Sequence, residues 1–170
     1  MTVTNKTVPQ EYQNIEDLID KINHEMPPLF RLKERGRLVL GEFVNSNIFS
    51  YNKKDQQFKE YQLTYSLDFF GSLQGKIFLN IEPDIAVHIT KLLFGDDLDD
   101  PISLVNEAMK ETLNIFSGHL VAFLHEFNHD LDIGVPSPVK HNFLESKCRK
   151  KILFRFLSND HVLQFLMEIH

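Results

Sequence analysis

Residues 103–127, SLVNEAMKETLNIFSGHLVAFLHEF, place apolar side chains at the spacing of an α-helix. The pattern recurs every three or four positions, at Val105, Met109, Leu113, Phe116, Leu120, Leu124 and Phe127. A period of this kind predicts one long helix that packs a single face against a core. We therefore expect this stretch to be the central helix of the fold.

The opposite side of this helix carries Glu107, Glu111, Asn114 and Gly118. Their spacing keeps all four within a stripe about 60° wide that faces away from the core. Glu and Asn on such a face ordinarily serve solubility. A glycine inside a helix costs roughly 1 kcal/mol relative to Ala, which is consistent with a surface that another molecule must approach closely.

The flanking segments predict a sheet. Alternation from Tyr61 to Phe70, with Thr64 and Ser66 on the polar side, indicates a half-buried strand, and a turn at 71–75 leads into a strand at 76–82. Pro83 should begin a second helix that Gly95 caps. Further strands are expected at 131–139, 151–157 and 162–169. The fold class is therefore α+β, a largely antiparallel sheet packed against a few helices including the long central one.

The N-terminal part is predicted to add a helix at 14–26, strands at 30–34 and 36–45, and a polar loop at 52–57. Residues 1–12 are polar and are expected to form a flexible tail before a single domain that covers residues 13–170. With 170 residues, 42% of them hydrophobic, the chain can bury one core.

The order Glu107-x3-Glu111-x2-Asn114-x3-Gly118, followed by Pro136 and Pro138, resembles the signature of the CheC/CheX/FliY family. That signature runs Asp or Ser, three residues, Glu, two residues, Asn, then about twenty-two residues and Pro. Here 21 residues separate Asn114 from Pro136, and 23 separate it from Pro138. The preceding Phe70–Leu79 segment and the Leu92-Leu93-Phe94-Gly95 helix end look like the elements before the signature in CheX-like proteins. The likeness covers roughly residues 60 to 140.

The resemblance implies a phosphatase that hydrolyses the phospho-aspartate of a CheY-type response regulator. Asn114 and Glu111 would be its catalytic residues, and Glu107 and Gly118 would contact the partner. Glu107 departs from the family's Asp or Ser, and binding should survive that change more readily than full catalytic rate. The alternative is a CheX-like module that binds a response regulator or a flagellar component without catalysis.

The same resemblance implies no cofactor of the chain's own and Mg²⁺ on the phosphorylated regulator. CheX-like proteins often pair through their sheets, so a homodimer is possible, and the apolar final strand at 162–169 could serve as its edge. The pattern Glu16-x3-Asp20-x2-Asn23 is a faint second copy of the signature, with Asp in place of Glu. We treat it as degenerate.

Net charge and hydropathy exclude other partners. The formal charge of −6 argues against nucleic acid, and the basic run from Lys147 to Lys151 is expected to solvate a turn. No stretch is long and apolar enough for a membrane span, and Met1 to Gln10 does not read as a signal peptide, so a cytoplasmic location is expected. Cys148 is the only cysteine and is expected to be an unreactive thiol.

Two patterns could indicate metals. His125-Glu126-Phe127-Asn128-His129 matches the H-E-x-x-H helix of zinc metalloproteases, in which two His one turn apart hold the metal and Glu activates water. Helix phase places both His on the outward face beside Asn114, and no motif supplies a third ligand, so a protease is a remote alternative. The acidic loop at 96–100 lacks the spaced ligands of a calcium loop. We expect no metal site.

Overall fold

The computed structural model describes residues 33–34, 37–38, 45–50, 63–126, 128–140, 150–158 and 161–170. Side-chain surroundings are described for 63–126, 128–140, 151–154 and 163–170. The predicted tail at 1–12, the helix at 14–26 with its second signature, the loop at 52–57 and Cys148 lie outside these residues. The proposed domain boundary at residue 13 lies outside them too.

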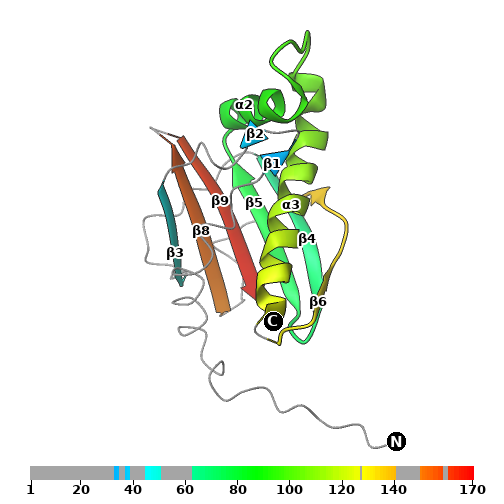
Figure 1. The fold of residues 1–170 in the computed structure, drawn as a ribbon, viewed down its shortest axis with the longest axis vertical. Helices are drawn as coiled ribbons and strands as arrows, with labels where there is room; N and C mark the ends of the chain where they lie inside the picture. Colours follow the sequence, from blue (N-terminus) through cyan, green and yellow to red (C-terminus); the bar gives the residue numbers. More distant parts are fainter. Residues whose placement is uncertain are drawn as a thin grey trace, which may run out of the picture.

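An antiparallel sheet forms the body of the described part (Figure 1). Its strands are, in spatial order, β3 (Asn45–Ser50), β8 (Lys150–Ser158), β9 (His161–Ile169), β5 (Gly75–Ile81), β4 (Leu63–Gly71) and β6 (Leu131–Ile133), while β7 (Ser137–Pro138) also pairs with β4. A separate hairpin joins β1 (Lys33–Glu34) to β2 (Arg37–Leu38). The predicted antiparallel arrangement is confirmed.

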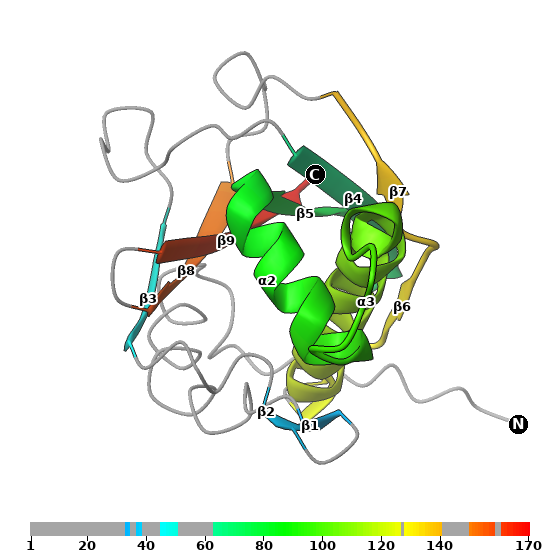
Figure 2. The same cartoon turned by 90° about the horizontal axis from the view of Figure 1, so that it is seen from above.

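Two helices pack on one face of this sheet (Figure 2). α2 (Pro83–Phe94) begins with proline at its first turn, and the Gly95 N–H donates to the Lys91 carbonyl 2.8 Å away to close its end. A short 3₁₀ helix (Ile102–Leu104) leads into α3 (Val105–Glu126). The predicted central helix and the predicted start and end of α2 are therefore confirmed.

Aromatic stacking holds the middle of α3 against the sheet. The ring of Phe116 lies parallel to that of Phe165 on β9, with centroids 3.7 Å apart, and meets Phe154 on β8 edge-on at 5.2 Å. All three side chains are fully buried. Because Phe116 can enter the core in only one orientation of the helix, this contact fixes which side of α3 faces outward.

The sheet face that points away from α2 and α3 is more buried than the sequence predicts. Thr64 and Ser66, expected on an exposed polar side of β4, are 7% and 5% exposed. The Thr64 hydroxyl donates to Asn80 Oδ1 (3.3 Å), and Asn80 Nδ2 donates to Gln164 Oε1 (3.4 Å), forming a polar row across three strands. These hydrogen bonds offset the cost of burying polar groups, which a period-two pattern cannot reveal.

Several strand predictions were wrong in detail. The single strand expected at 131–139 is two short strands, β6 and β7, that pair with different parts of β4. Of the strand expected at 36–45, residues 36 and 39–44 lie outside the described residues, while its expected end at residue 45 is wrong, because β3 begins there and continues to Ser50. Lys151, expected to solvate a turn, is buried and forms an ion pair of 3.1 Å with Glu168.

The final strand cannot provide the dimer edge that its apolar sequence suggested. β9 lies between β5 and β8 and pairs with both along its length. Its backbone hydrogen-bonding groups are used within the sheet, so pairing with a second copy through this strand is excluded. Central strands and edge strands look alike in sequence because both alternate or cluster apolar residues.

Candidate functional site

The candidate stripe lies on the exposed side of α3. Glu107, Asn114 and Gly118 are exposed and Glu111 is partly exposed, whereas Met109, Leu113, Phe116, Leu120 and Leu124 are buried. The helix phase inferred from the sequence is therefore the phase in the structure. A methyl group on Gly118 would have no heavy atom within 4 Å, so that position is open to a partner.

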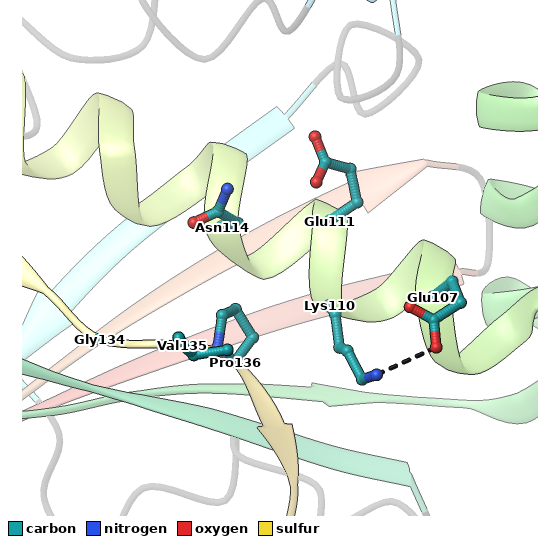
Figure 3. A pocket seen from close by; sticks show the side chains of 7 residues that line it. All are labelled: Glu107, Lys110, Glu111, Asn114, Gly134, Val135 and Pro136. Atoms are coloured by element: carbon teal, nitrogen blue, oxygen red, sulfur yellow. Dashed lines mark hydrogen bonds and ion pairs between the residues drawn. The ribbon is translucent and has the colours of Figure 1, made fainter.

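A cavity of about 330 Å³ lies between α3 and the segment that joins β6 to β7 (Figure 3). We call it the α3 cavity. Its lining comprises Glu107, Lys110, Glu111, Asn114, Gly134, Val135 and Pro136. Three candidate residues of α3 (Glu107, Glu111 and Asn114) thus line the same cavity as the candidate Pro136, which follows Asn114 by some twenty residues in sequence. Gly118 lies outside this lining, and Pro138 instead pairs with Tyr65 in the sheet.

Glu111 and Asn114 present their polar groups without partners among the residues that the structure describes. No hydrogen bond or ion pair joins the Glu111 carboxylate or the Asn114 carboxamide to any residue in the described part of the chain. Figure 3 shows Asn114 on the turn of α3 nearest Val135 and Pro136, and Glu111 one turn away, pointing away from those two residues. Both groups keep their hydrogen-bonding capacity for a ligand.

Glu107 is engaged with its own helix. Lys110 Nζ lies 3.0 Å from Glu107 Oε1, and the Asn106 side-chain amide donates to the same oxygen at 3.2 Å. The Glu107 carboxylate also lies near β4. The pKa of the Tyr65 hydroxyl is raised, mainly by burial and to a smaller extent by the negative charge of Glu107. The first signature position is therefore paired with a cation of its own helix.

The H-E-x-x-H stretch does not form a zinc-binding helix. α3 ends at Glu126, and Asn128 takes a positive φ of 64°, which turns the chain. His129, expected on the outward face, is instead only 8% exposed, with Nδ1 3.5 Å from the Ser72 hydroxyl. The exposed His125 faces Asp130 at 3.9 Å. Among the residues with described side chains, no three His, Cys, Asp or Glu residues group together as metal ligands would.

Sequence reasoning missed Lys110, Gly134 and Val135. Lys110 lies four residues before Asn114, a spacing that puts the two on adjacent turns, and that signal was available. Val135 is 87% exposed despite its apolar side chain, and no periodic pattern marks a single exposed valine in a loop. Its place beside α3 depends on the pairing of β6 and β7 with β4.

We compared the chain with models of known protein families. The family model described as "Chemotaxis phosphatase CheX" matches residues 63–156, more than half of the chain. The chain belongs to the CheX family. The matched region contains α3 and the complete lining of the α3 cavity.

Solved structures of CheX-family and CheC-like proteins share the fold at low sequence identity. A chemotaxis protein CheX from Desulfovibrio desulfuricans is 18% identical, with a TM-score of 0.62 over 78% of this chain and 99% of the other. CheX of Borrelia burgdorferi, in a complex described as CheX-CheY-BeF3-Mg+2, is 20% identical, with a TM-score of 0.58 over 78% and 93%. A CheC-like protein from Shewanella is 17% identical, with a TM-score of 0.57 over 74% and 81%.

These likenesses confirm the predicted fold and the family resemblance. A comparison with curated proteins gives no match. Within the described part of the chain, no helix combines the length and apolar character needed to cross a membrane.

Proposed function

We propose that this CheX-family chain hydrolyses the phospho-aspartate of a CheY-type response regulator by inserting the exposed face of α3 into the regulator's active site. The observation that carries the proposal is the Asn114 carboxamide in the α3 cavity, one turn from Glu111 and opposite Pro136, which has no hydrogen-bond partner among the described residues. The complex of Borrelia burgdorferi CheX with CheY, BeF3 and Mg+2 supports a partner of this class.

Hydrolysis of a phospho-aspartate requires few catalytic groups from the phosphatase. A phospho-aspartate is an acyl phosphate. Water attacks phosphorus, the phosphorus–oxygen bond to the aspartyl group breaks, and the products are inorganic phosphate and a free carboxylate. A partner therefore needs mainly to hold water in line with the breaking bond. The regulator's own Mg²⁺ and lysine would neutralise the phosphoryl charge.

Asn114 suits the task of positioning that water. Its amide oxygen can accept a hydrogen bond from the water while its NH₂ group donates to a phosphoryl oxygen or to the regulator backbone. A carboxamide carries no charge, so it does not repel the anionic phosphoryl group as a carboxylate would. Glu111, partly exposed and lining the same cavity, would pair with a cation of the regulator and hold the register between the two proteins.

The test is the lifetime of phospho-aspartate on CheY-type regulators from the same organism. Wild-type protein should shorten that lifetime. Asn114→Ala should restore the uncatalysed lifetime while keeping its thermal transition, since Asn114 makes no internal hydrogen bond in the described part of the chain. His119→Ala, an exposed truncation on the same helix outside the α3 cavity, is the matched control and should remain active.

Two further results distinguish a phosphatase from a module that binds the regulator without catalysis. Glu111→Lys should weaken association by placing like charges together, and unchanged binding would remove Glu111 from the interface. Binding of regulators without any change in phosphate lifetime would indicate the non-catalytic module. The engagement of Glu107 by Lys110 is the observation that keeps this module as the second candidate.

A further inference from the structure

Among the described residues that line the α3 cavity, Lys110 is the single cation. Its side chain is 31% exposed, compared with 60% for Glu107, so the lysine is the more enclosed member of the pair. In Figure 3 it extends toward Glu107 along the side of α3 that faces Gly134–Pro136. The Lys110 backbone therefore lies one helical turn before Asn114, and its ammonium lies beside Glu107, at the side of the α3 cavity away from Asn114.

The surroundings of Lys110 are otherwise unfavourable for an anionic ligand. Glu107 and Glu111 line the same cavity, and the whole chain carries a formal charge of −6. A phosphoryl group that approached Asn114 would meet these carboxylates at close range. Lys110 is the cationic lining residue of the described part, and it offsets part of this negative charge.

The Glu107–Lys110 pair can be exchanged at little cost. It spans three residues on a solvent-facing side of the helix, where such ion pairs contribute little to stability. An ammonium has three N–H donors, and this contact uses one of them. The Glu107 oxygen would retain the Asn106 amide as a donor if Lys110 turned toward a ligand.

Resting on the proposed function, we propose that Lys110 is a specificity-determining residue that makes docking at the α3 cavity selective for the phosphorylated form of the regulator. Its ammonium donates to an oxygen of the phosphoryl group. Glu107 is a positioning residue, since its carboxylate holds the lysine at the mouth of the cavity until the ligand arrives. The uncharged Asn114 remains available to orient water.

The experiment measures dissociation constants for one regulator with and without beryllofluoride and Mg²⁺, the phosphoryl mimic. Wild-type protein should prefer the loaded regulator. Lys110→Gln should reduce that preference about tenfold, equivalent to about 1.4 kcal/mol, by weakening binding of the loaded form alone. Lys110→Arg should restore most of it, and Glu107→Gln should reduce it less than Lys110→Gln does, because the cation remains but loses the carboxylate that holds it.

Lys76→Gln is the matched control for the loss of one positive charge. Lys76 also pairs with a carboxylate, Asp68, at 2.6 Å, but on the sheet face opposite α3. The control should keep the wild-type preference. Equal losses in Lys76→Gln and Lys110→Gln, or an unchanged preference in Lys110→Gln, would overturn the assignment.

The outcomes also separate this inference from the proposed function. If wild-type protein shortens phosphate lifetime and Lys110→Gln keeps its preference for the loaded regulator, only the role of Lys110 fails. If no regulator binds wild-type protein in either form, both fail. Asn114→Ala should lose hydrolysis yet retain the preference, because the two residues act on different steps.

Discussion

Gly118→Ala should make the protein more stable and at the same time a poorer partner. Gly118 lies inside α3, is exposed, and has open space where a methyl group would go. The substitution therefore adds no clash within the described structure. It removes the conformational freedom that glycine retains in the unfolded chain, so the folded state gains relative to the unfolded state.

The size of the two effects follows from the structure. Replacing a helical glycine by alanine raises the free energy of unfolding by about 1 kcal/mol. For a chain of this length that raises the melting temperature by about 3 °C. If the regulator backbone approaches Gly118 closely, the new methyl group should weaken binding about tenfold, the equivalent of about 1.4 kcal/mol. The signs are opposite, so a general loss of structure cannot imitate the result.

Calorimetry of the free protein and titration with the regulator measure the two quantities. Gly95→Ala is an instructive comparison, because Gly95 also has open space but a φ of +118° at the end of α2. It should lower stability by about 1–2 kcal/mol without changing regulator affinity. Unchanged affinity in Gly118→Ala would refute close approach of the regulator at this position. A lower melting temperature would refute the placement of Gly118 at an exposed helix position with room for a methyl group.

Three further predictions concern α3 and its C-terminal turn. Ser117→Ala should raise the free energy of unfolding by about 1 kcal/mol, because the buried Ser117 hydroxyl has no hydrogen-bond partner in the described part of the chain; a loss in chemical denaturation would contradict this. Phe116→Ala should lower it by about 3–5 kcal/mol through loss of the stack on Phe165; a cost below about 1 kcal/mol would mean that the ring does not hold α3 in place. Burial lowers the pKa of His129, so the unfolded state binds this proton first and stability should fall as pH drops below about 6.5. His129→Asn should reduce that slope, and an unchanged slope in this variant would contradict the prediction.

The elements and the outward stripe could be predicted because their signals are local. Helical spacing from Val105 to Leu124 requires one face to be apolar, and the stripe of Glu107, Glu111 and Asn114 then follows from geometry alone. Pro83 and Gly95 mark the ends of α2 through backbone restrictions that act within one turn. Strands β4, β5, β8 and β9 were likewise located by short-range alternation or apolar runs.

Spatial order and close approach required the tertiary structure. Sequence could not place β9 inside the sheet, because strand order is set by long-range pairing rather than by any local pattern. The same pairing brings Pro136 and Val135 beside Asn114 and forms the α3 cavity. The burial of Thr64, Lys151 and His129 likewise depends on partners distant in sequence. The sequence by itself thus determined which residues α3 presents, whereas packing decided what they face, since a cavity is formed only where separate segments converge.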